Sequence, residues 1–179
     1  MLKEGADPNA PDENGDTPLH LAVSRCGRKF AVLDIVYALL EHGARPNAYN
    51  PAGATPLHLA AAKTDDATVW TLLEHYADPL ARDPRGQTPL HYAAAAGKWR
   101  VAELLAGRGG VNAKDYEGNT PLHLAAAAGE VAATMGLLER GADPWARNNE
   151  GELPIDVAKS SDVAKVLKEA MALRRWRRK

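Results

Sequence analysis

The stretch "GDTPLHLA", residues 15–22, decides the fold, because its core "TPLH" returns at residues 55–58, 88–91 and 120–123. The glycine two residues before each copy recurs with it, and once more without it, at Gly15, Gly53, Gly86, Gly118 and Gly151. The intervals between successive glycines are 38, 33, 32 and 33 residues. A period near 33 residues indicates a chain built from stacked structural repeats.

Each unit predicts two helices joined by a turn. Threonine is a favoured helix N-cap, and the proline after it suits the first helical position, where no N–H is needed. The first helix is rich in alanine, as in residues 90–97, so that neighbouring helices approach closely. The second helix is more apolar and ends at a glycine, such as Gly43 or Gly141, that accepts a left-handed backbone.

The chain resembles the ankyrin-repeat family, on the strength of "G-x-TPLHLA", the "A-A-x-x-G" break and the phrase "LLxxGADxNA", which recurs at residues 39–48, 72–81 and 137–146. The resemblance implies an all-α solenoid of L-shaped helix-turn-helix units with projecting β-hairpin loops. The expected single domain, residues 1–179, divides into a half repeat (1–12), repeats at about 13–47, 51–80, 84–112 and 116–145, a C-terminal capping repeat (149–173) and a basic tail (174–179).

Composition argues for a globular protein without a strong charge preference. The chain has 179 residues, 45% of them hydrophobic and 25% charged, and its formal net charge is −1. Nothing global therefore attracts it to nucleic acid or membranes. A single cysteine, Cys26, forms no disulfide within the chain and favours a reducing compartment. We expect a cytoplasmic location, with the nucleus as an alternative.

The four "TPLH" histidines are predicted to be structural. They lie in the first turn of a helix, and the resemblance implies that they join a hydrogen-bond network between repeats. Metal binding needs ligands that converge within a few ångströms, whereas stacked helices lie roughly 10 Å apart. We therefore expect no metal site and no cofactor. The histidines concerned are His20, His58, His91 and His123, and the other two, His42 and His75, also occupy repeat positions.

No catalytic residue is expected either. The chain has no nucleophile elbow, phosphate-binding loop or zinc-protease motif. Cys26 has basic neighbours that would lower its pKa, but no histidine outside the repeat positions is available as its base. The prediction is a non-enzyme without a small-molecule substrate.

The resemblance implies protein recognition through a concave face of hairpin tips and first helices. Tyrosine and arginine are favoured at the energetic centres of interfaces, and the first hairpin is acidic while the middle two are more basic. The partner expected is a protein or peptide of unknown identity. The candidate contact residues are Asp16, Arg25, Tyr49, Lys63, Arg82, Arg85, Lys114, Tyr116 and Glu117.

Three alternatives remain open from the sequence. The incomplete first unit favours a regulatory or targeting segment of a larger protein or a translocated effector. The tail "RRWRRK", residues 174–179, carries five positive charges and is either a solvated helix end or a contact for an anionic surface or nucleic acid. A monomer is expected, with self-association through the open half repeat as the alternative.

Some positions depart from the repeat pattern. Tyr76 stands where other units have glycine, and a positive φ there would strain the backbone. The first interval has five extra residues, which lie in or near residues 24–34. Trp70 and Trp99 fall in expected second helices, where packing between units would account for them.

Overall fold

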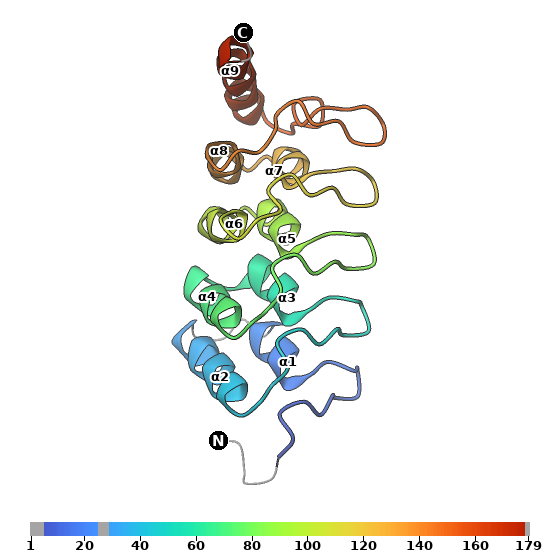
Figure 1. Cartoon of the computed structure of the whole chain (residues 1–179), viewed down its shortest axis with the longest axis vertical. Helices are drawn as coiled ribbons and strands as arrows, with labels where there is room; N and C mark the ends of the chain where they lie inside the picture. Colours follow the sequence, from blue (N-terminus) through green and yellow to red (C-terminus); the bar gives the residue numbers. More distant parts are fainter. Residues whose placement is uncertain (1–5, 25–28, 178–179) are drawn as a thin grey trace.

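The chain forms two rows of helices and one row of hairpin loops (Figure 1). The structure, a computed structural model, describes residues 6–24 and 29–177. The inner row consists of α1 (Pro18–Ser24), α3 (Pro56–Lys63), α5 (Pro89–Ala95) and α7 (Pro121–Ala128). The outer row consists of α2 (Lys29–Glu41), α4 (Asp66–Glu74), α6 (Trp99–Ala106), α8 (Val131–Glu139) and α9 (Ser161–Arg177). Within these described residues there is no strand, so the predicted all-α solenoid is confirmed.

Each inner helix begins where the sequence predicts. Thr55, Thr88 and Thr120 are N-caps with extended backbone, and a proline follows each of them as the first helical residue. The inner helices pack on one another in chain order and each packs on the outer helix that follows it. Short helices of seven or eight residues are unstable alone, so stacking is what stabilises them.

The core is a continuous layer of leucine and alanine between the two rows. The leucine of each "TPLH" is at most 1% exposed, and pairs of fully buried alanines, such as Ala60 and Ala61, lie one turn further on. Alanine brings neighbouring backbones close together, and burying each leucine contributes roughly 1.5–3 kcal/mol. The largest buried side chains besides leucine are the four "TPLH" histidines.

The hairpin loops stack on one another along the molecule. In four of the five loops an aspartate or asparagine accepts backbone N–H groups two and four residues later, as Asp83 does from Arg85 and Gln87. In the second loop Asn50 accepts the N–H four residues later, from Ala54. The glycine three residues after this aspartate or asparagine has a positive φ, 76° at Gly86. A Cβ at Gly86 would collide with the ring of Tyr116 in the next loop. Glycine is therefore required at this position for two reasons: it adopts a positive φ without strain, and it has no Cβ to block the close approach of the next hairpin.

The last unit keeps the hydrogen bonds of its first turn but not the helix. Residues 154–157 form turns. The carboxylate of Asp156 accepts the N–H of Leu153 at 2.8 Å, as a histidine ring accepts the threonine N–H in the earlier units. Within the described residues no later unit needs a donor from this position, so a carboxylate is sufficient here. Val163 and Leu167 of α9 are fully buried and close the core.

Three departures from the pattern have structural outcomes. Helix α2 has 13 residues, against eight or nine in α4, α6 and α8, so part of the extra length extends this helix. Residues 25–28, including Arg25 and Cys26, lie outside the described residues. Trp70 and Trp99 are 49% and 44% exposed. The expectation that packing between units accounts for both tryptophans is therefore wrong.

Tyr76 has a φ of 65°, the one positive value outside glycine among the described residues. It ends α4 as Gly43 ends α2, because the next residue's N–H reaches back to the last turn in both cases. Its side chain is 88% exposed and contributes little packing. We predict that Tyr76→Gly raises the free energy of unfolding by about 1 kcal/mol, because glycine has no left-handed penalty. Urea denaturation measures the change.

The control for this prediction is Gly43→Ala, where φ is 86° and a Cβ meets no atom within 4 Å. This variant is expected to lose about 1 kcal/mol. A destabilised Tyr76→Gly would contradict the account.

Thr68 and Thr134 are fully buried and lie near the start of α4 and α8 respectively. The hydroxyl of Thr134 donates to the Glu130 carbonyl at 2.8 Å, whereas the hydroxyl of Thr68 has no partner within the described part of the chain. We predict that Thr68→Val stabilises the protein by about 1 kcal/mol and that Thr134→Val destabilises it by a similar amount. Equal losses in the two valine variants, measured by thermal and urea unfolding, would refute this difference.

Candidate functional site

The four buried histidines form a ladder that joins consecutive units. In each, Nδ1 accepts the backbone N–H of the capping threonine at 3.1–3.3 Å and lies 2.8–2.9 Å from its hydroxyl. The opposite nitrogen, Nε2, points at a carbonyl oxygen of the next hairpin. These Nε2–oxygen distances are 3.0 Å for His20 and Ala54, and 3.1 Å for His58 and Gln87, His91 and Asn119, and His123 and Glu152.

This geometry selects one tautomer. A carbonyl oxygen only accepts hydrogen bonds, so Nε2 must carry the proton, and Nδ1 must be bare to accept from threonine. Protonation of Nδ1 would place its N–H against the backbone N–H of the threonine, a donor-to-donor contact, and leave only the hydroxyl as an acceptor. Burial lowers the pKa of all four histidines, and this effect is larger than that of the hydrogen bonds they donate to the next unit's carbonyls, which raise the pKa. The rings are therefore neutral structural links.

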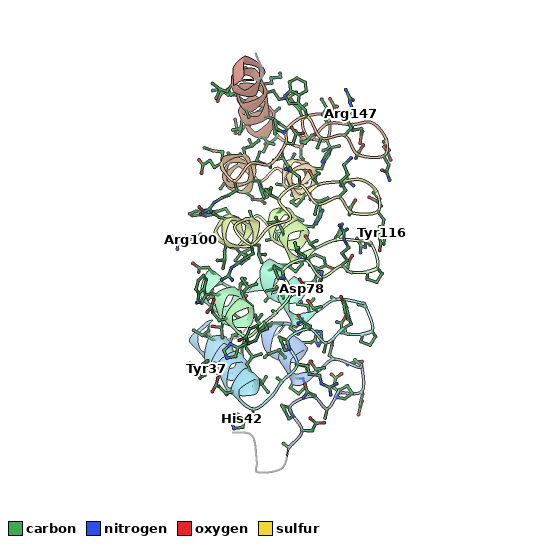
Figure 2. The ribbon with its side chains drawn as sticks, viewed as in Figure 1. Tyr37, His42, Asp78, Arg100, Tyr116 and Arg147 are labelled. Carbon is green, nitrogen blue, oxygen red and sulfur yellow. The ribbon has the colours of Figure 1, made fainter. Side chains whose placement is uncertain are left out.

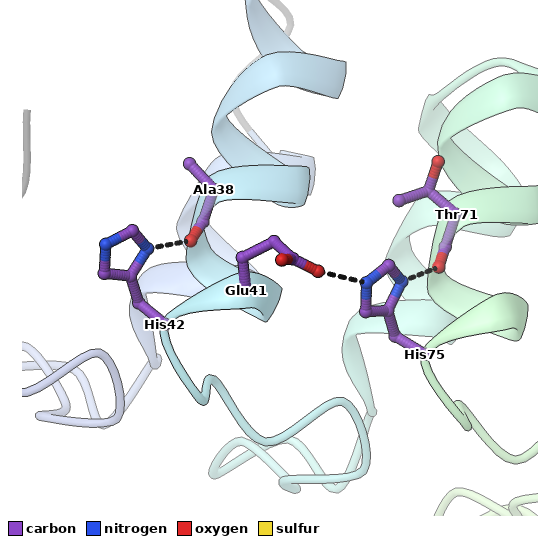
Figure 3. A network of polar contacts seen from close by, with 5 residues as sticks. All are labelled: Ala38, Glu41, His42, Thr71 and His75. Carbon is purple, nitrogen blue, oxygen red and sulfur yellow. Dashed lines mark hydrogen bonds and ion pairs between the residues drawn. The ribbon is translucent and has the colours of Figure 1, made fainter.

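The outer row contains a different histidine arrangement (Figure 3). His75 Nδ1 lies 2.8 Å from the Thr71 carbonyl oxygen and Nε2 lies 3.3 Å from Glu41 of the preceding unit. Both partners are acceptors, so only the imidazolium makes both hydrogen bonds. His42 bonds within its own helix end, with Nδ1 at 2.7 Å from the Ala38 carbonyl. Arg108 and Arg140 continue the row of ion pairs, with Glu74 at 3.2 Å and Glu103 at 2.6 Å.

The surface best placed for a partner is the hairpin face, which we define as loops 12–16, 49–54, 82–87, 114–119 and 147–152 with the inner helices. Figure 2 shows Tyr116 and Arg147 on the row of hairpins, opposite Arg100 on the outer row. Tyr49 is 56% exposed and Tyr116 is 68% exposed. Between them Arg85 is exposed, and its guanidinium makes no hydrogen bond or ion pair within the described residues. These three side chains are available for contact.

Two of the candidate cations are engaged by the scaffold. Arg82 Nη1 donates to the carbonyls of Gly86, at 2.6 Å, and Lys114, at 2.8 Å. Lys114 Nζ in turn donates to the Arg147 carbonyl at 2.7 Å. Both residues are exposed, yet each ties its hairpin to the next one. Their charge is available to a partner, but their hydrogen-bonding capacity is partly used.

The remaining candidates have mixed surroundings. Asp16 is half-buried and accepts from the Asn50 side chain at 2.9 Å. Glu117 is exposed and accepts from Asn119 at 3.2 Å. Lys63 is the exposed last residue of α3, on the inner row. Arg25 and the side chains of the basic tail lie outside the described residues.

The structure adds a hollow that the sequence analysis missed. It has a volume of about 240 Å³ and lies against α7, between the hairpins at 114–119 and 147–152. Its apolar floor contains Leu124, Ala127 and Val157, and its polar wall contains Glu117, Glu150 and Glu152. Glu150 occupies the loop position of Arg85, two residues after the turn aspartate or asparagine. Extending the aligned hairpin positions to the fifth loop would have found it.

Other kinds of site have little support in the described ranges. Residues 6–24 and 29–177 contain no group of three or more histidine, cysteine, aspartate or glutamate side chains placed to hold a metal ion. In the same part of the chain, no helix has the length and apolar content needed to cross a membrane. The four ladder histidines lie in successive units and point along the stack.

The comparison with known proteins agrees with the repeat architecture described above. A family model described as ankyrin repeats (3 copies) covers residues 1–83 and 79–148. The matched segments contain all four "TPLH" copies and the first four hairpins. A search of curated proteins finds no match.

The ladder predicts how stability depends on pH. Burial puts the folded pKa of each histidine below 6.5, so the unfolded chain binds more protons as the pH falls. The contribution of the four histidines to the free energy of unfolding is complete above pH 6.5. It is lost as the pH falls from there toward the folded pKa values, by up to about 1.4 kcal/mol per pH unit for each histidine. The free energy of unfolding from urea denaturation at several pH values between 7.5 and 5 measures this dependence.

The control is His42→Gln, because His42 is exposed and bonds only within its own unit in the described structure. This variant is expected to keep the pH dependence. A free energy of unfolding that stays constant between pH 7 and pH 5.5 would show that the rings are not buried as neutral links.

Proposed function

The chain belongs to the ankyrin-repeat family, and we propose that it acts as a binding module for a protein partner through its hairpin face. Ankyrin repeats are generally protein–protein interaction modules and typically lack catalytic activity. The observation that carries the proposal is the exposure of Tyr49, Arg85 and Tyr116 on one row of rigid loops.

Rigidity supports this choice of surface. The backbone of Tyr116 donates to the Arg85 carbonyl at 2.9 Å, and its ring lies against Gly86. The loops are thus fixed by their neighbours before a partner arrives. Contact residues on a preorganised surface lose little conformational freedom on binding, so more of their contact energy becomes affinity.

The distribution of charge along the hairpin face indicates which charges the partner carries. Arg82 and Arg85 make the third loop basic, and Lys114 adds a positive charge at the start of the fourth. Glu117, Glu150 and Glu152 make the hollow between the fourth and fifth loops acidic. The complementary partner has acidic groups that face the middle loops and a basic side chain that enters the hollow. The apolar floor of the hollow fits the methylene stem of such a side chain, and the glutamates fit its charged end.

The test is the combined change of Tyr49→Ala, Arg85→Ala and Tyr116→Ala. Proteins captured from native lysate by the unchanged chain are identified, purified and measured for affinity against both forms. We expect the triple variant to bind at least about 30-fold more weakly, as for the loss of an interface hot spot. Circular dichroism verifies that the variant keeps its helices.

The matched control is Ile35→Ala with Met135→Ala, because both side chains are about half exposed on the outer helices. This control is expected to retain full affinity. A partner that binds the triple variant as tightly as the unchanged chain, or that loses affinity only with the control, would reject the hairpin face.

A further inference from the structure

A second surface lies on the outer row, away from the hairpins. It is a groove of about 550 Å³ formed by α4, α6 and the end of α8. We call it the tryptophan groove and define it by its lining residues, Asp66, Ala67, Trp70, Trp99, Arg100, Glu103, Leu104 and Arg140. Figure 2 shows Arg100 on the side opposite Tyr116, so a partner on this groove would not cover the hairpin face.

The two tryptophans are not needed by the core. Val69, Leu72 and Leu73 bury the inward side of α4, and Val101, Ala102 and Leu105 bury that of α6. Each tryptophan is about half exposed, on adjacent helices, at the walls of one groove, and the Arg108 guanidinium lies 5.1 Å from the centroid of the Trp70 ring. Exposed aromatic surface that is gathered in a groove marks an interaction site rather than scattered surface apolarity.

The hydrogen-bonding groups of the groove define what it can accept. Neither indole N–H has an acceptor within the described residues, and Arg100 makes only a ring contact there, 5.2 Å from the centroid of Trp99. On the acceptor side, Glu103 is occupied by Arg140 at 2.6 Å, and Asp66 is the other carboxylate of the lining. The groove therefore offers more free donors than free acceptors. A proline-rich segment matches this set, because its carbonyls need donors whereas its prolines have no N–H.

The charges at the groove indicate that the bound segment is acidic. Arg100 lies in the first turn of α6, and that turn contains no acidic residue. The positive end of the helix dipole adds to its guanidinium charge. Asp66 is in the first turn of α4, where the same dipole compensates its negative charge. The surroundings of Arg100 are therefore complementary to a carboxylate.

We propose that the tryptophan groove docks a proline-rich, acidic segment of a partner protein in the polyproline II conformation. The prolines pack against Trp70 and Trp99, the indole N–H groups donate to the segment's carbonyls, and its carboxylate meets Arg100. Aromatic-lined grooves bind this conformation because it is already extended and loses little entropy on docking. The binding would be independent of the hairpin face.

The experiment uses the indole N–H resonances of the full chain in ¹H–¹⁵N spectra. The probe is a synthetic peptide of about nine residues, prolines with one central glutamate, which extends by about 3.1 Å per residue in the polyproline II conformation. Trp70 and Trp99 are expected to shift and saturate, while Trp145, which does not line the groove, stays unchanged. Trp70→Ala and Trp99→Ala should each weaken binding about tenfold or more, and Trp145→Ala should not.

Two further arms test the chemistry. A peptide with alanine in place of every proline should bind at least about tenfold more weakly, because it must be ordered on binding. Arg100→Glu should weaken the glutamate peptide and strengthen one with lysine at that position. Unchanged Trp70 and Trp99 resonances, equal binding of the alanine peptide, or shifts that depend on protein concentration without peptide would each overturn the proposal.

The same peptide distinguishes this proposal from the hairpin-face proposal. The variant with alanine at Tyr49, Arg85 and Tyr116 is expected to bind the proline-rich peptide with unchanged affinity. If that variant loses the peptide, the docking site is not the tryptophan groove.

Discussion

A buried, neutral histidine that bridges two units is the interaction on which the rest of the structure depends. One nitrogen of its ring accepts from the threonine that starts a helix, and the other donates to the hairpin of the next unit, at 3.1 Å from the Asn119 carbonyl in the case of His91. A single side chain thus caps its own helix and fixes where the next hairpin lies. Because the ring is fully buried, losing either bond would leave a polar group without a partner, at a cost of about 1–3 kcal/mol.

The stacking of hairpins limits which residues are available for recognition. The residue after each turn aspartate or asparagine packs on the glycine of the preceding loop, as Pro84 does on Gly53 and Tyr116 on Gly86. The residue before it reaches forward when it is Arg82 or Lys114. The position two residues after it, which holds Arg85 in one loop and Glu150 in another, is the least constrained. A different residue at this position changes the side chain that is offered to a partner without changing how the hairpins stack.

The sequence predicted the parts of this structure that follow from the period. Thr-Pro at a helix start, the inward leucine and the histidine between units are local consequences of a motif that is repeated four times. The last unit follows the same logic. Asp156 accepts the N–H of Leu153, as the histidine ring accepts the threonine N–H in the earlier units, but a carboxylate has no N–H to donate to a following hairpin. These features depend on one unit and its neighbour, and the spacing of the motif already determines that neighbourhood.

Other features depend on distances across units that spacing does not give. Whether Arg82 faces a partner or bonds to Lys114 depends on its rotamer and on the reach of the next loop. The exposure of Trp70 and Trp99 depends on how α4 and α6 are rotated about their axes, which the spacing of the repeats does not give. The acidic hollow combines two loops and a helix, so no single motif predicts it.

The protonation state of the four ladder histidines tests the central claim most directly. Long-range ¹H–¹⁵N correlation spectra of the full chain at neutral pH distinguish a protonated Nε2 from a protonated Nδ1 in each ring. The account predicts that His20, His58, His91 and His123 are neutral with the proton on Nε2. Rings with the proton on Nδ1, or rings that carry a proton on both nitrogens at neutral pH, would contradict it.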